Sequence, residues 1–236
     1  MPRRHSPVQR VLTTALWPFG ISLTSWHYMW RTTPLHRRED VGAMEHDAPP
    51  LLPTDITPDD VQGADDGVGA LFHRRYRVSI RGSDMAPDDV IAAVGADLNA
   101  VAPTEFARFT KVEGDDGVIC VGDVFVVRMP GPWNGPVRVV AVTTTSFRLA
   151  TLDGHLEAGQ IELRASRSDD GLLEFNIESW ARSGDRLSWV LYQHVRMAKE
   201  VQLHMWTSFL ERVARLAGGR MTGGIDIDTR WVEWAP

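Results

Sequence analysis

The sequence predicts one α+β domain, over about residues 71–219, in which a curved antiparallel sheet wraps around a long C-terminal helix. About five or six strand-like segments between residues 110 and 180 are separated by turn signals such as Asp153-Gly154. A helical stretch over about 186–217 then carries one apolar stripe and stops at Gly218-Gly219. A helix with one apolar stripe needs an apolar surface to cover, and the concave face of a sheet supplies it.

The first part of this domain predicts a strand followed by two helices. Tyr76, Val78 and Ile80 alternate with arginines, as in a half-exposed strand. Residues 87–98 predict a helix, because they begin with a proline and two acids that suit a helix N-terminus. Residues 103–109 predict a second, short helix.

The strands are expected in one continuous run before the long helix. A rigid loop rich in proline and glycine interrupts the run at 130–136. The predicted strands are 110–113, 118–128, 137–142, 147–152, 155–166 and 172–180.

Three flanking segments have different compositions. Residues 1–38 hold six arginines and no acid and show helical apolar spacing, so we expect a basic amphipathic arm. This arm either packs on the domain or contacts an anionic membrane surface. Residues 39–70 hold nine acids and several prolines and no lysine or arginine, and they predict an extended acidic linker, solvated or lying along arginines of the domain. Residues 220–236 are expected to form a C-terminal tail.

Charge and cysteine content narrow the function classes. The formal net charge of −6 argues against a generic nucleic-acid binder, because the phosphate backbone favours a basic surface. Cys120 is the sole cysteine, so neither an internal disulfide nor a cysteine-rich zinc site can form, and the chain fits the cytoplasm. Its apolar surroundings predict that Cys120 is buried. No phosphate loop, nucleophile elbow or dinucleotide motif occurs, and we expect no cofactor.

The order of the predicted elements is that of the helix-grip fold, in which a gap between sheet and helix often forms a pocket. Three runs, at 122–133, 150–159 and 178–185, resemble an actinobacterial family of unknown function. That family is similar to START lipid-transfer domains, birch-pollen-allergen-like proteins and polyketide cyclases (the SRPBCC superfamily). The resemblance implies a helix-grip fold with an apolar cavity over about 71–219, and no catalytic residue follows from it.

Candidate ligand-binding residues follow from this arrangement. Gln202 is polar yet falls on the buried stripe of the long helix, so it needs a partner or a ligand. Arg128 and Trp133 border the loop that could form the mouth of a cavity, where an arginine suits a carboxylate or phosphate group. His155 follows a tight turn and could orient a polar group. The apolar wall would be formed by Leu191, Val195, Met205, Trp206 and Phe209.

Other charged residues fit a structural role. Glu162, Glu174, Asn176 and Glu178 alternate with apolar residues, so we expect them to face solvent. No spacing supplies the three or four ligands that a metal needs. Three functions stay open: binding of an apolar or amphipathic molecule, lipid or polyketide-like; an enzyme of the cyclase or hydrolase type in the same cavity; and an interaction protein with a filled core.

Overall fold

The computed structural model describes residues 33–53, 60–129, 134–184 and 196–234 of the chain. The amphipathic arm up to residue 32, Trp133, Leu191 and Val195 therefore lie outside the described residues. The strands are β1 (Leu35–Val41), β2 (Val68–Arg81), β3 (Arg108–Glu113), β4 (Val124–Arg128), β5 (Asn134–Val142), β6 (Ser146–Thr151), β7 (Glu157–Arg167), β8 (Leu173–Ser183) and β9 (Arg220–Val232). The helices are α2 (Met44–Asp47), the short 3₁₀ turn η1 (Ala64–Asp66), α3 (Pro87–Ala96), α4 (Leu98–Val101) and α6 (Arg196–Leu216).

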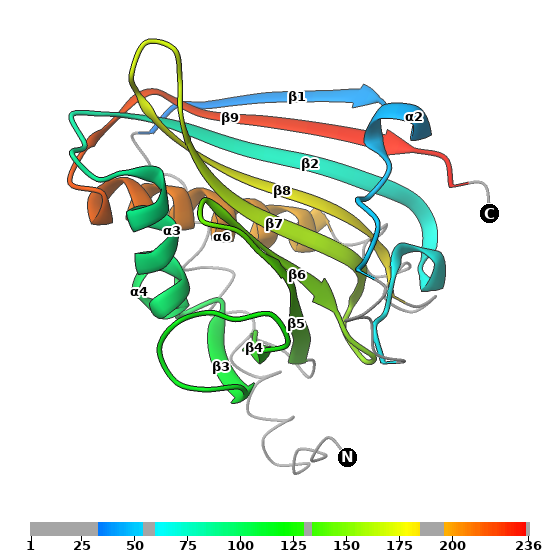
Figure 1. The fold of residues 1–236 in the computed structure, drawn as a ribbon. Coiled ribbons are helices and arrows are strands. Elements are labelled where there is room, and N and C mark those ends of the chain that lie inside the picture. Colours follow the sequence, from blue (N-terminus) through cyan, green and yellow to red (C-terminus); the bar gives the residue numbers. More distant parts are fainter. Residues whose placement is uncertain (1–32, 54–59, 130–133, 185–195, 235–236) are drawn as a thin grey trace.

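All nine strands form one sheet in the order β1-β9-β2-β8-β7-β6-β5-β4-β3. Neighbouring strands are antiparallel except β1 and β9, which run parallel. Helices α3, α4 and α6 lie on one side of the sheet, which we call the inner face, and α2 lies at the other, outer face (Figure 1). The chain is thus an α+β fold with a large mixed sheet and a long C-terminal helix.

The main core lies between the inner face and these three helices. Side chains two residues apart on a strand share a face, so Tyr76, Val78 and Ile80 of β2 point to α6. Phe175 of β8 packs against Phe209 of α6 with ring centroids 6.3 Å apart. These two phenylalanines are at most 1% exposed, so side chains fill this middle part of the interface.

Three local expectations are wrong. The second helix lies at Leu98–Val101 instead of 103–109, because the Asp97 side chain accepts the backbone N–H of Asn99 and starts the helix earlier. The long strand expected over 118–128 begins only at Val124, since a turn at Gly122 precedes it. Cys120 is exposed, whereas its neighbour Ile119 is buried.

The flanking segments contribute to the sheet and its outer face. Strand β1 crosses the boundary expected at residue 38, and β9 occupies most of the expected tail. The acidic segment crosses the outer face of the domain: the carbonyls of Pro50 and Leu51 accept hydrogen bonds from Gln160 and Arg148, and Asp60 pairs with Arg138. Within the described residues, no helix is long and apolar enough to cross a membrane.

Candidate functional site

A polar cluster interrupts the apolar inner face near the N-terminal end of the described part of α6. Arg74 of β2 is 5% exposed, and its Nη1 donates to Oε1 of Gln202 at 2.9 Å. The Gln202 amide nitrogen in turn lies 3.3 Å from Oε1 of Glu157 on β7. Gln202 therefore joins a buried guanidinium to an inward-facing carboxyl, which we call the inner polar cluster.

The protonation states in this cluster are displaced from ordinary values. Burial raises the pKa of Glu157, although the positive charge of Arg74 and the hydrogen bond from Gln202 lower it in part. Burial also raises the pKa of Tyr76, the next inward residue on β2, to about 12. A carboxyl with a raised pKa beside a buried arginine is typical of functional sites, because such sites need a group that exchanges protons near neutral pH.

His155 lies next to Glu157 and is held as a neutral imidazole. Its Nδ1 lies 2.9 Å from the backbone nitrogen and 3.0 Å from the carbonyl oxygen of Glu157. Burial lowers the pKa of His155 to about 4, against the opposing effect of its hydrogen bond to the Glu157 backbone. The ring stands against Gly135 of β5, where an added Cβ would come within 2.8 Å of Nε2. Glycine at position 135 thus makes room for the imidazole.

Two buried donors near the cluster have no hydrogen-bond partner among the described residues: the Ser179 hydroxyl and the indole nitrogen of Trp206. Ser179 stands directly opposite Arg74 in the β2–β8 ladder and shares its face. Trp206 follows Gln202 by four residues on α6, so the two lie on the same side of that helix. Buried polar groups are nearly always hydrogen-bonded, so these two donors raise the question of which water or ligand group would satisfy them.

The acidic segment positions the turn that carries His155 and Glu157. The Gln62 side-chain amide donates to the backbone carbonyls of both residues at 3.0 Å, and its oxygen accepts the Gly154 N–H at 3.3 Å. Its backbone also bonds β6 and β7, through Thr151 and Gly159. Gln62, which is not a member of the inner polar cluster, therefore holds this turn in place through hydrogen bonds.

The ligand-binding residues predicted from the sequence do not all lie at one site. Gln202 belongs to the inner polar cluster, His155 adjoins it, and Trp206 follows Gln202 by one helical turn on α6. Phe209 is deeper in the packed core, and Met205 is partly buried against it. Arg128 does not join them, because β4 directs Phe125 and Val127 inward and so places exposed Arg128 on the outer face.

The candidate site residues predicted from the sequence do not include Arg74, Glu157 or Ser179. All three could have been found from the sequence, because side chains two residues apart on a strand point to the same face of the sheet. Arg74 is in phase with the core residues of β2, Ser179 with Phe175 and Ile177, and Glu157 with the buried residues of β7. A charged or polar residue on the apolar face of a strand, such as Arg74, thus indicates the inner site better than a residue at the end of a strand, such as Arg128.

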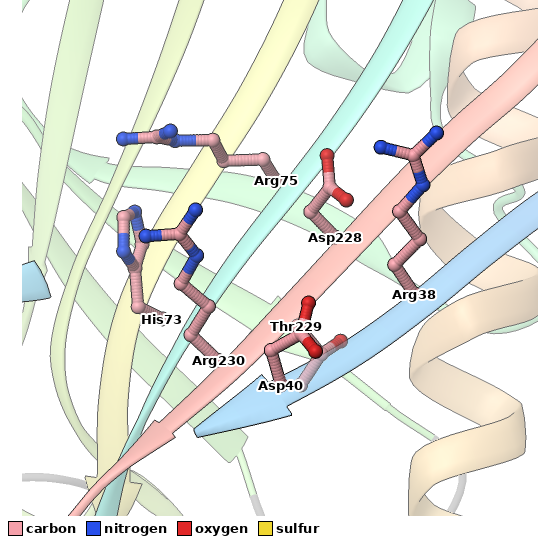
Figure 2. A pocket seen from close by; sticks show the side chains of 7 residues that line it. All are labelled: Arg38, Asp40, His73, Arg75, Asp228, Thr229 and Arg230. Atoms are coloured by element: carbon pink, nitrogen blue, oxygen red, sulfur yellow. The ribbon is translucent and has the colours of Figure 1, made fainter. Parts of the chain in front are cut away.

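A second polar site lies on the outer face, where a hollow of about 160 Å³ is bordered by charged side chains (Figure 2). One of the side chains that line it is His73, whose ring nitrogens lie 2.7 Å from carboxylate oxygens of Asp47 and Glu178. Carboxylate oxygens accept hydrogen bonds, so each of these oxygens can accept a hydrogen bond from the ring nitrogen that it faces. The residues that line the hollow are Arg38, Asp40, His73, Arg75, Asp228, Thr229 and Arg230.

Opposite charges balance each other around this hollow. Arg75 bonds Glu178 at 2.5 Å, and Arg230 lies 3.5 Å from Asp47. His73 also stacks on Trp180, with ring centroids 5.2 Å apart. The arrangement attaches α2 to the sheet and gives no excess charge with which to select a ligand. Among the residues that the structure describes, no three His, Cys, Asp or Glu side chains converge as a metal site requires.

Comparison with known proteins shows the family of this chain. The sequence model of the family described as "Domain of unknown function (DUF1990)" matches residues 68–212, well over half of the chain. The chain belongs to this family. The inner polar cluster lies wholly inside the DUF1990 domain, whereas β1, α2 and β9 lie outside the matched residues. The DUF1990 domain thus contains the candidate site, and the flanking segments extend its sheet.

Solved structures resemble the DUF1990 chain weakly. A hypothetical protein from Helicobacter pylori is 9% identical, with a TM-score of 0.46 over 71% of this chain and 95% of its own. Norcoclaurine synthase from Thalictrum flavum is 12% identical, with a TM-score of 0.43 over 64% and 94%. The major latex-like protein 151 from Panax ginseng is 15% identical, with a TM-score of 0.41 over 62% and 98%. No protein of curated function matches the chain in sequence.

Proposed function

We propose that the DUF1990 chain uses a helix-grip arrangement to bind a small amphipathic molecule, lipid or polyketide-like, between the sheet and α6. The polar group of this molecule would lie at the inner polar cluster. The observation that carries the proposal is the buried Ser179 hydroxyl, which lacks a partner among the described residues and stands opposite buried Arg74. Leaving such a group unsatisfied costs about 1–3 kcal/mol, and a ligand oxygen would remove that cost.

The chemistry of the cluster defines the polar group. Arg74, Ser179 and the indole of Trp206 all offer hydrogens, and the raised pKa of Glu157 favours its protonated, donating form. A set of donors suits a carbonyl or carboxylate oxygen. The apolar part of the molecule would lie against Met205 and Trp206. His155 would contribute the edge of a neutral ring.

The test compares two serine variants that remove the same atom. Ser179→Ala deletes the unsatisfied hydroxyl, whereas Ser146→Ala deletes a buried hydroxyl that bonds Thr143 on the outer face. The protein is purified from a native-like host, denatured, and its small molecules are identified by mass spectrometry. We expect a stoichiometric compound in the wild type and in Ser146→Ala, reduced at least about tenfold in Ser179→Ala. An equal amount in both variants would contradict the proposal, and no compound in any of them would favour the filled core.

A second function, an enzyme of the cyclase or hydrolase type, is supported by one observation. Glu157 is an ionisable group that faces inward with a raised pKa, as a general acid or base requires. In this case Glu157→Gln would keep the bound compound and abolish its conversion. Incubating the extracted compound with the wild type and with Glu157→Gln distinguishes the two functions: unchanged compound in both reactions indicates a binding protein.

A further inference from the structure

Strand β1 forms one edge of the nine-stranded sheet. Among the described residues it pairs only with β9, so its other side presents backbone N–H and C=O groups in a row. Every residue of β1 after Leu35 is exposed, and Val41 is 69% exposed. An exposed strand edge is a template for pairing with another strand.

The residue order of β1 is complementary to itself. When two copies of this strand run antiparallel about Arg38, residue 35 faces 41, residue 36 faces 40 and residue 37 faces 39. His36 then lies opposite Asp40, and Arg37 lies opposite Glu39, each twice by symmetry. Arg37 and Glu39 carry opposite charges, and oppositely charged cross-strand pairs stabilise a ladder, whereas like charges destabilise it. An isologous twofold interface needs this kind of self-complementarity.

The axis and the ends of such a ladder also fit. At the axis two copies of Arg38 would meet, but each stands opposite Asp228 of its own β9, and Asp40 of the other copy is its diagonal neighbour. At each end Leu35 would face Val41. Val41 adjoins Trp231 across the β1–β9 ladder, and this tryptophan is 45% exposed. Pairing would therefore bury apolar surface at both ends.

Charges on an edge strand ordinarily prevent pairing. In β1 the basic residues precede the acidic ones. An antiparallel second copy therefore brings its acidic residues opposite the basic residues of the first copy. We infer that β1 is a homodimerisation edge through which two copies of the chain join their sheets in antiparallel register. The other edge of the sheet, β3, plays no part in this contact.

Charge reversal tests the inference in the full-length chain. Arg37→Glu places two acids opposite each other, and Glu39→Arg places two bases opposite each other. Each single variant should dissociate with a dimer constant weakened roughly tenfold or more, measured by sedimentation velocity over a concentration series. The double variant R37E/E39R should dimerise again, and an equimolar mixture of the two single variants should form heterodimers.

A matched control separates this contact from a general loss of charge. Arg77→Glu reverses an equally exposed strand arginine on β2, away from the edge, and should leave the dimer intact once circular dichroism shows that it is folded. A monomeric wild type at all concentrations would overturn the inference. Single variants that dimerise like the wild type, or a double variant that fails to recover, would overturn it as well.

Discussion

His73→Ala removes the imidazole that joins two carboxylates on the outer face. His73 is 3% exposed and Asp47 is 1% exposed, so neither can turn to water without moving α2. After the substitution Asp47 keeps the backbone N–H of Ala43 at 2.9 Å and Arg230 at 3.5 Å. Breaking a buried ion pair by removing one partner costs about 3–5 kcal/mol. Because Glu178 keeps Arg75 and is half-buried, we expect the lower end, about 3 kcal/mol.

Urea denaturation at pH 7 measures this change in the free energy of unfolding. His46→Ala is the matched control, because His46 is an exposed histidine on the same helix and should change stability by less than about 0.5 kcal/mol. In thermal unfolding the loss in His73→Ala corresponds to about 6–12 °C. A loss below about 1 kcal/mol in His73→Ala would refute the reasoning, since it would mean that Asp47 is satisfied without the imidazole.

The pH dependence gives an independent check on the same network. Burial raises the pKa of Asp47 and of Glu178, but hydrogen bonds from His73 and nearby positive charges outweigh it, so both pKa values are lowered. Stability from a lowered carboxyl pKa is present above the unfolded value of about 4 and is lost as the pH falls through the folded value. The wild type should therefore lose more stability than His73→Ala between about pH 5 and pH 3. Parallel curves would contradict this assignment.

Three further predictions concern the inner face and the sheet. Gln202→Leu should destabilise the protein by about 1–3 kcal/mol in urea, because Arg74 and Glu157 lose their common partner; a neutral result would show that both side chains are satisfied without it. The raised pKa of Glu157 contributes stability below about pH 4.5 that is lost as the pH rises, so Glu157→Gln should flatten the decline in stability above this pH, and an unchanged slope would exclude this role. Gly159→Ala should cost at least about 2 kcal/mol in thermal unfolding, since its Cβ would lie 1.9 Å from a β8 carbonyl oxygen, whereas Gly63→Ala meets nothing closer than 3.6 Å and should be tolerated.

Local sequence patterns predicted the elements whose determinants are local. The helix at Pro87–Ala96 begins at its proline, and β6, β7 and β8 are bounded by the turns at Asp153-Gly154 and Asp170-Gly171. Strand β9 was missed although Ile225 and Ile227 alternate with acids, because Gly218-Gly219 suggested the end of the domain. Strand β1 has no apolar alternation, so its pairing with distant β9 decides its conformation.

The candidate site was predicted in part. Gln202 could be found because it is polar on an apolar helix stripe, and a helix stripe is read from one segment alone. Arg74, Glu157 and Ser179 come from three strands, and their meeting depends on the register of the β2–β8 and β7–β8 ladders. Register depends on pairing between distant segments, so the sequence of one strand does not specify which residues meet. Arg128 illustrates the same limit, because it lies on the outer face whereas its neighbour Val127 points inward.

The most direct test of the proposed ligand site is a high-resolution crystal structure of the protein purified from a native-like host. The account predicts density for an organic molecule between the sheet and α6, with an oxygen within about 3.2 Å of the Ser179 hydroxyl or the Trp206 indole nitrogen. Protein side chains that satisfy both groups, or single ordered waters in an otherwise filled interface, would contradict it.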